Sequence, residues 1–146
     1  MTIPTRSDWG DIDENDLDAQ WALKQFLGKT FADAEAMFAE NALYYQEDLQ
    51  SMSAAPLNFY APALAKYLNS DRSHGDSDGA SSFLHTLIWI LKTRPEIFTS
   101  DVKGILIRTA KRIANRQVLY DADVNIYGQF SDLYSEIRRL NMSHGD

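Results

Sequence analysis

The residues best suited to metal chemistry lie in a polar run over residues 69–81, which reads NSDRSHGDSDGAS. Its D-x-D-G pattern at residues 76–79 matches the middle of an EF-hand calcium loop. With the glycine as sixth position, however, His74 would come first and His85 last. Those positions require a carboxylate and a bidentate glutamate, because calcium is held by oxygen ligands. The run therefore does not fit a calcium site.

A small-ligand or metal-dependent enzyme with a pocket near residues 69–81 stays open as an alternative. Its polar groups would be His74, Asp76, Asp78 and His85. Their spacing matches no common metal-ligand pattern, and Ser81 and Ser82 do not lie in a G-x-S-x-G turn. We therefore predict a protein that is not an enzyme, with no catalytic residue, no metal and no cofactor. Helix punctuation explains the run better, with Asp76 or Asp78 as the N-cap of a following helix.

A second group joins two tyrosines to two carboxylates, Tyr44, Tyr45, Glu47 and Asp48. Adjacent positions on a helix point about 100° apart, so the two acids are not expected to face one substrate as a catalytic pair. Tyrosine beside carboxylate is typical of recognition surfaces, where an amphipathic ring packs next to a charge. This group favours binding over catalysis.

Four bases recur with helical spacing at Arg108, Lys111, Arg112 and Arg116. A nucleic-acid site would usually interleave aromatic residues for stacking, and none is present here. The net charge of −7 also opposes binding to phosphate backbones. We predict no nucleic-acid partner, and we expect this basic face to be exposed or paired with acids of the N-terminal third.

The acidic excess lies entirely in the first third of the chain. Residues 1–50 contain 11 acidic and 3 basic residues, a net charge of −8, whereas residues 51–100 are neutral overall and residues 101–146 carry +1. Such a field attracts basic partners and repels anionic lipid surfaces, so we predict no membrane partner. The absence of cysteine excludes disulfides, and the acidic N-terminus does not read as a signal peptide. These features favour a cytoplasmic location.

Hydrophobic periodicity predicts an all-α fold, a compact irregular bundle of six or seven helices, since strand and hairpin signals are scarce. The expected helices cover residues 13–27, 30–41, 42–52, 56–68, 80–93, 101–114 and 123–140. Leu17 and Trp21 would begin the buried stripe of the first helix, with Ala22 and Phe26 widening it. Pro62 predicts a break or kink near Ala61. We expect a flexible segment over residues 1–12, one helical domain over residues 13–141 and a frayed tail over residues 142–146.

Part of the chain resembles a group of small, uncharacterised bacterial proteins. The shared pattern is LGK at residues 27–29, A-x-x-x-F at 34–38, Y-x-E-D-L at 45–49 and Y-x-x-A-x-x-x-Y-L at 60–68. The resemblance implies no activity and assigns no functional residue. More loosely, a small acidic all-α protein of this composition is similar to bacterial toxin-immunity proteins, which cover basic toxins with acidic, tyrosine-rich surfaces.

The sequence therefore predicts an acidic protein-binding module, most concretely an immunity or inhibitor protein for a basic bacterial toxin. The residues expected to contact the partner are Tyr44, Tyr45, Glu47, Asp48, Asp71, Asp76 and Asp78. Whether the protein is a monomer or a homodimer stays open at this stage.

Overall fold

The computed structural model describes residues 2–144 and confirms the predicted all-α class, since these residues form helices and no strand. The α-helices are α1 (Leu17–Phe26), α2 (Phe31–Gln46), α3 (Ala54–Leu68), α4 (Ser77–Thr93), α5 (Ser100–Ala114), α6 (Val124–Tyr127) and α7 (Phe130–His144). Four 3-10 helices join them: η1 (Ser7–Trp9), η2 (Glu47–Ser51), η3 (Asp71–Ser73) and η4 (Gln117–Tyr120). None of the described helices is long and apolar enough to span a membrane.

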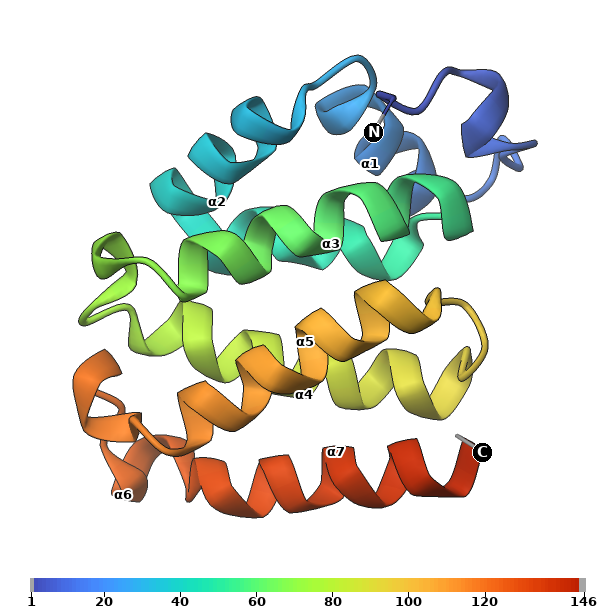
Figure 1. Ribbon diagram of the computed structural model, residues 1–146. Helices are drawn as coiled ribbons and strands as arrows, with labels where there is room; N and C mark the ends of the chain where they lie inside the picture. The colour runs from blue at the N-terminus through green and yellow to red at the C-terminus, as the bar shows by residue number, and fades with distance from the viewer. Residues whose placement is uncertain (1, 145–146) are drawn as a thin grey trace.

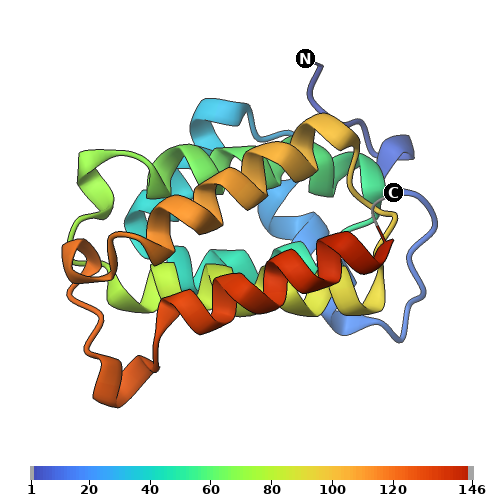
Figure 2. The same cartoon turned by 60° about the horizontal axis from the view of Figure 1, so that its bottom comes forward.

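The longer helices pack into an irregular bundle (Figure 1). Helix α3 lies between α2 and α5, and α7 packs along both α4 and α5. After a 60° turn, α3 and α5 again lie side by side, as do α4 and α7 (Figure 2). The short helix α1 packs against η2, and α6 projects at the opposite end of the bundle.

Helix α3 forms the centre of the core, with ten of its fifteen residues buried. The sequence predicted a break or a kink near Ala61, and the break is absent, because the helix continues through Pro62. A proline inside a helix costs about 3 kcal/mol through its lost donor and its clash with the preceding turn. Burial of large side chains on α3, including Leu57, Tyr60 and Leu64, offsets this cost, since each contributes about 1.5–3 kcal/mol.

The first helix begins later than predicted, and its buried stripe is confirmed only in part. Leu17 and Trp21 were expected in the core, but their side chains are 71% and 46% exposed. Ala22 and Phe26 are buried as expected, and Ala19 is buried with them. Small alanine side chains let α1 approach closely, and the two larger residues are left facing outward.

One predicted helix boundary is confirmed and another differs. Asn41 has a non-helical backbone (φ −159°, ψ 82°) at the point where the sequence predicted one helix to end and the next to begin, so α2 consists of two helical segments that meet at a kink. Gly128 adopts φ +73° and separates α6 from α7, where one continuous helix was expected. Glycine takes this left-handed region at little cost, so the break is encoded by that residue. Helix α7 extends to His144, while Gly145 and Asp146 of the expected tail lie outside the described residues.

The N-terminal segment expected over residues 1–12 contains η1, which packs against α3. Trp9 is buried there, and its carbonyl accepts a hydrogen bond from the Ser53 hydroxyl at 2.9 Å. Its ring lies 6.4 Å from that of Tyr60. This segment therefore contributes an aromatic side chain to the core.

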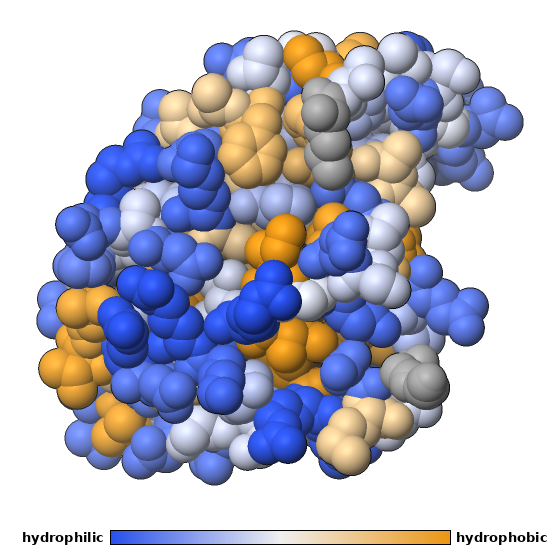
Figure 3. Space-filling view, viewed as in Figure 1, coloured by the Kyte–Doolittle hydropathy of each residue, from blue (hydrophilic) through white to orange (hydrophobic). Residues whose placement is uncertain are grey.

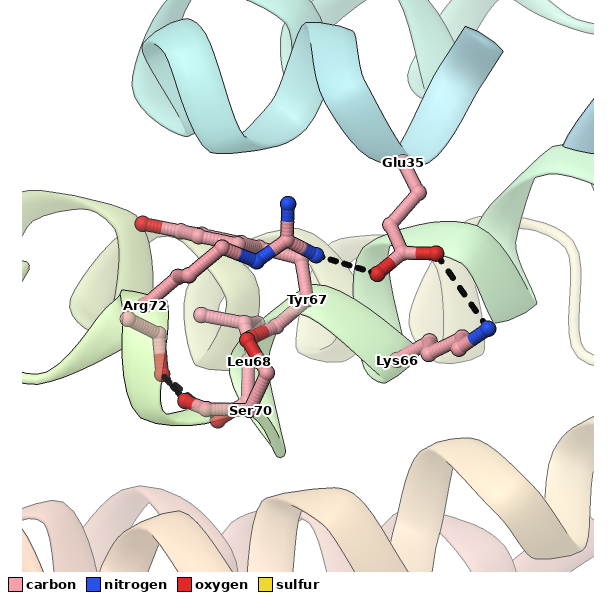
Figure 4. A network of polar contacts seen from close by, with 7 residues as sticks. Glu35, Lys66, Tyr67, Leu68, Ser70 and Arg72 are labelled. Atoms are coloured by element: carbon pink, nitrogen blue, oxygen red, sulfur yellow. Dashed lines mark hydrogen bonds and ion pairs between the residues drawn. The ribbon is translucent and has the colours of Figure 1, made fainter. Parts of the chain in front are cut away.

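A half-buried carboxylate links three helices on one side of the bundle (Figure 4). Glu35 of α2 accepts a hydrogen bond from Arg72 of η3 and lies 3.4 Å from the Lys66 ammonium of α3. Arg72 and Lys66 are themselves exposed, so the network adds little stability but fixes the position of the turn that follows α3.

Asp76 is the N-cap of α4, which decides between the two acids that the sequence left open. Its Oδ1 accepts a hydrogen bond from the Gly79 amide at 2.9 Å, and its Oδ2 accepts one from the Tyr67 hydroxyl at 2.7 Å. Burial and this hydrogen bond to a carboxylate raise the pKa of Tyr67, so its proton is held in place. Gly75 supplies the preceding turn with φ +85°, whereas Gly79 lies inside the helix.

We predict that Asp76→Ala lowers the free energy of unfolding by about 2 kcal/mol, because it removes a helix cap and leaves the Tyr67 hydroxyl without its acceptor. Asp78→Ala is the matched control. Asp78 accepts only an exposed bond from Tyr127, and we expect a loss of about 0.5 kcal/mol or less. Urea denaturation of both variants measures the difference. Equal losses would contradict the assignment of the cap.

Candidate functional site

A cavity of about 300 Å³ opens between α1, the end of α2 and η2. We call it the acidic pocket. It is lined by Asp18, Trp21, Tyr44, Glu47, Asp48, Gln50 and Ser51. Three of these residues are carboxylates and two carry aromatic rings, a combination that suits a cationic ligand.

The kink at Asn41 helps to shape this pocket. The Asn41 side chain accepts a hydrogen bond from the Tyr44 amide at 3.1 Å, so it caps the last turn of α2 in the way an N-cap residue begins a helix. This turn leads directly into η2, and Glu47 and Asp48 at the start of η2 both line the cavity.

The outer wall of the pocket is aromatic. The Trp21 indole N–H donates to the Tyr44 hydroxyl at 3.3 Å, which joins α1 to α2 across the opening. Tyr44 in turn packs against Tyr45 with ring centroids 4.9 Å apart. The Trp21 and Tyr44 side chains are 46% and 43% exposed, so large aromatic surface is available to a partner.

The pocket also contains one buried carboxylate. Asp48 is only 7% exposed, and its Oδ2 accepts a hydrogen bond from the Gln25 amide of α1. Burial, together with the smaller effect of the neighbouring carboxylates of Glu47 and Asp18, raises the pKa of Asp48 to about 6 against the opposing effect of the Gln25 hydrogen bond. Among the described residues no cation pairs with this carboxylate.

The seven residues predicted from sequence separate into two groups. Tyr44, Glu47 and Asp48 line the acidic pocket, and Tyr45 supports it from behind by packing edge-on against Phe26 with ring centroids 6.3 Å apart. The remaining three acids lie elsewhere, on η3 and the start of α4.

Those three acids make contacts within the protein. Asp71 is exposed and lies 3.6 Å from the His74 imidazole, while Asp76 and Asp78 accept the hydrogen bonds described above. They do not extend the acidic pocket, and the structure gives them roles at helix ends.

Glu47 and Asp48 both line the pocket, although sequence reasoning did not expect them to face one substrate. Adjacent residues of a 3-10 helix still point about 120° apart, and Asp48 is accordingly buried while Glu47 is exposed. Sequence reasoning also missed Asp18, Trp21 and Gln25, which α1 contributes. One signal was available: Lys24 falls on the side assigned to the buried stripe, and its ammonium lies 5.2 Å from the Trp21 ring centroid at the surface.

The polar residues of the alternative enzyme hypothesis are divided between separate places. His74 faces a shallow hollow beside Arg116 and Asp121, whereas Asp76 and Asp78 line a different one beside Tyr67. His85 is exposed on α4. In the part of the chain that the structure describes, no three His, Asp or Glu side chains are arranged to hold a metal ion.

Of the two arrangements expected for the basic residues at Arg108, Lys111, Arg112 and Arg116, the structure shows the exposed one. Within residues 2–143, no acidic side chain forms an ion pair with Arg108, Lys111, Arg112 or Arg116. Strongly hydrophilic side chains lie along this helix beside apolar ones, and an apolar patch lies at the end formed by η4 and α6 (Figure 3). The exposed apolar residues there are Val118, Val124 and Ile126.

In comparisons with known proteins, no protein-family model, curated protein or solved structure matches the chain. The fold and the acidic pocket therefore define it as an all-α bundle with a cation-suited cavity.

We predict that Asp48→Asn stabilises the protein in a pH-dependent manner. The native state binds the Asp48 proton more tightly than the unfolded chain does, so ionisation of Asp48 opposes folding. This penalty is absent below about pH 4, grows as the pH rises towards 6 and is complete above that, at up to about 3 kcal/mol. Urea denaturation between pH 4 and 8 measures the stability difference between variant and wild type.

The control is Asp11→Asn at an exposed carboxylate outside the pocket, whose difference from wild type should stay flat over the same range. If the difference in free energy of unfolding between Asp48→Asn and the wild type does not change with pH, burial does not raise the pKa of the Asp48 carboxyl.

Proposed function

We propose that this protein is a non-enzymatic binding module that docks a basic protein partner at the acidic pocket. Its most concrete form is an immunity or inhibitor protein that neutralises a basic bacterial toxin in the cytoplasm. One observation carries the proposal: three carboxylates and two exposed aromatic rings share one cavity in the most acidic part of the chain.

The two kinds of residue would contribute differently. The net charge of −8 over residues 1–50 would accelerate association with a basic surface and orient the encounter. Trp21 and Tyr44 would supply short-range affinity, because large aromatic side chains dominate binding energy at protein interfaces. The Trp21–Tyr44 hydrogen bond holds both rings in place before the partner arrives, which reduces the entropy lost on binding.

The test uses the product of the neighbouring gene as the first probe, with affinity measured by calorimetry at two salt concentrations. We predict that Glu47→Lys combined with Asp48→Asn weakens binding at least about tenfold and flattens its salt dependence, because one pocket charge is reversed and a second is removed. A basic toxin that the wild-type protein neutralises in a growth assay should escape neutralisation by this variant.

Asp71→Lys is the matched control, since Asp71 is an exposed acid that the sequence also predicted to bind but that lies outside the pocket. Its effect should stay within about twofold. If the pocket variant binds as tightly as the wild type, or if Asp71→Lys is the more damaging change, the acidic pocket is not the docking site.

A further inference from the structure

We propose that the acidic pocket is a receptor for a single guanidinium group, so that the partner is recognised through one inserted arginine side chain. This inference rests on the proposed function and specifies the chemistry of the same site. The preference for a guanidinium group follows from the residues at the floor, the walls and the rim of the cavity.

The floor of the cavity offers an unused hydrogen-bond acceptor. Asp48 is more than nine-tenths buried, and Gln25 satisfies only its Oδ2. Its Oδ1 has no hydrogen-bond partner within the described part of the chain, and no cation balances its charge. A carboxylate that is buried without a counter-ion is costly, and a cationic donor from outside would remove that cost.

The walls favour a flat cation over a round one. Trp21 and Tyr44 present ring surface to the cavity, and a planar guanidinium stacks on such rings in a way that a lysine ammonium does not. The Trp21 ring already attracts a cation within this molecule, because the Lys24 ammonium lies 5.2 Å from its centroid.

The rim adds further acceptors. Asp18 and Glu47 line the opening and are exposed, whereas Asp48 lies below them. A guanidinium has five N–H donors in a fixed plane and can bond to more than one carboxylate at once, while an ammonium acts as a compact point charge.

Dehydration decides between the two cations. Asp48 has already lost most of its contact with water, so its ligand must also shed water in order to reach it. An arginine side chain is more weakly hydrated than a lysine side chain and loses less on entering. The structure therefore favours arginine as the inserted residue.

The test is an NMR titration of the whole protein with three capped amino acids: N-acetyl-arginine methylamide, the lysine analogue and the neutral citrulline analogue. The indole N–H signal of Trp21 reports on the pocket, and the indole signals of Trp9 and Trp89, which do not line it, are internal references. Trp21→Phe identifies the reporter signal by its loss.

We expect the arginine compound to shift the Trp21 signal in a saturable way. Its half-saturation concentration should lie at least about fivefold below that of the lysine compound, and citrulline should give no saturable shift. Asp48→Asn should raise the half-saturation concentration for arginine about tenfold, because a charged hydrogen bond at the floor is lost. Asp71→Asn, the control outside the pocket, should leave it within about twofold.

Equal half-saturation by arginine and lysine, a comparable shift by citrulline, or an unchanged value in Asp48→Asn would each overturn the inference. These failures are distinct from failure of the proposed function. Capture of a basic partner that depends on Glu47 and Asp48, without arginine selectivity, would leave the function standing and refute the receptor. Arginine-selective binding to the pocket, together with capture of the partner that does not depend on Glu47 and Asp48, would support the receptor and refute the proposed function.

Discussion

Two tyrosine hydroxyls on α3 hold the ends of other helices, and the arrangement of the bundle depends on them. The Tyr60 hydroxyl lies 2.8 Å from the carbonyl oxygens of Phe26 and Lys29, at the point where α1 ends. The Tyr67 hydroxyl donates to the cap of α4. Buried polar groups must find partners, and helix ends have unpaired ones, so the central helix and its neighbours satisfy each other. A core of aliphatic residues alone would leave α1 and α4 free to slide.

The acidic pocket inherits its shape from this arrangement. Once α1 is fixed at its C-terminal end, Trp21 and Gln25 project towards the end of α2, where Asn41 has redirected the chain into η2. The hydrogen bonds of Trp21 to Tyr44 and of Gln25 to Asp48 then close the cavity from two sides. Each is a side-chain contact between residues 23 positions apart in the chain. The pocket is therefore a tertiary feature, and no single helix contains it.

That origin explains which features the sequence could predict. Hydrophobic spacing and caps act locally, so the all-α class and the Asp76 or Asp78 cap followed from short stretches. The exposure of Trp21 depended on how closely alanines let α1 approach, and the continuity of α3 through Pro62 depended on burial by its neighbours. Tyr44, Glu47 and Asp48 were found because they are close in sequence. Asp18 and Gln25 were missed because they lie on α1, which only tertiary packing brings close to the end of α2.

The unpaired bases of α5 have a consequence for the molecule as a whole. Positive charge on that helix is not neutralised by the acids of the first third, so the two signs stay apart and the protein has a permanent electric dipole. A charged surface exerts a torque on such a molecule before any contact is made. Successive molecules therefore approach the same surface with the same side forward, which a bundle of equal net charge but evenly mixed signs would not do.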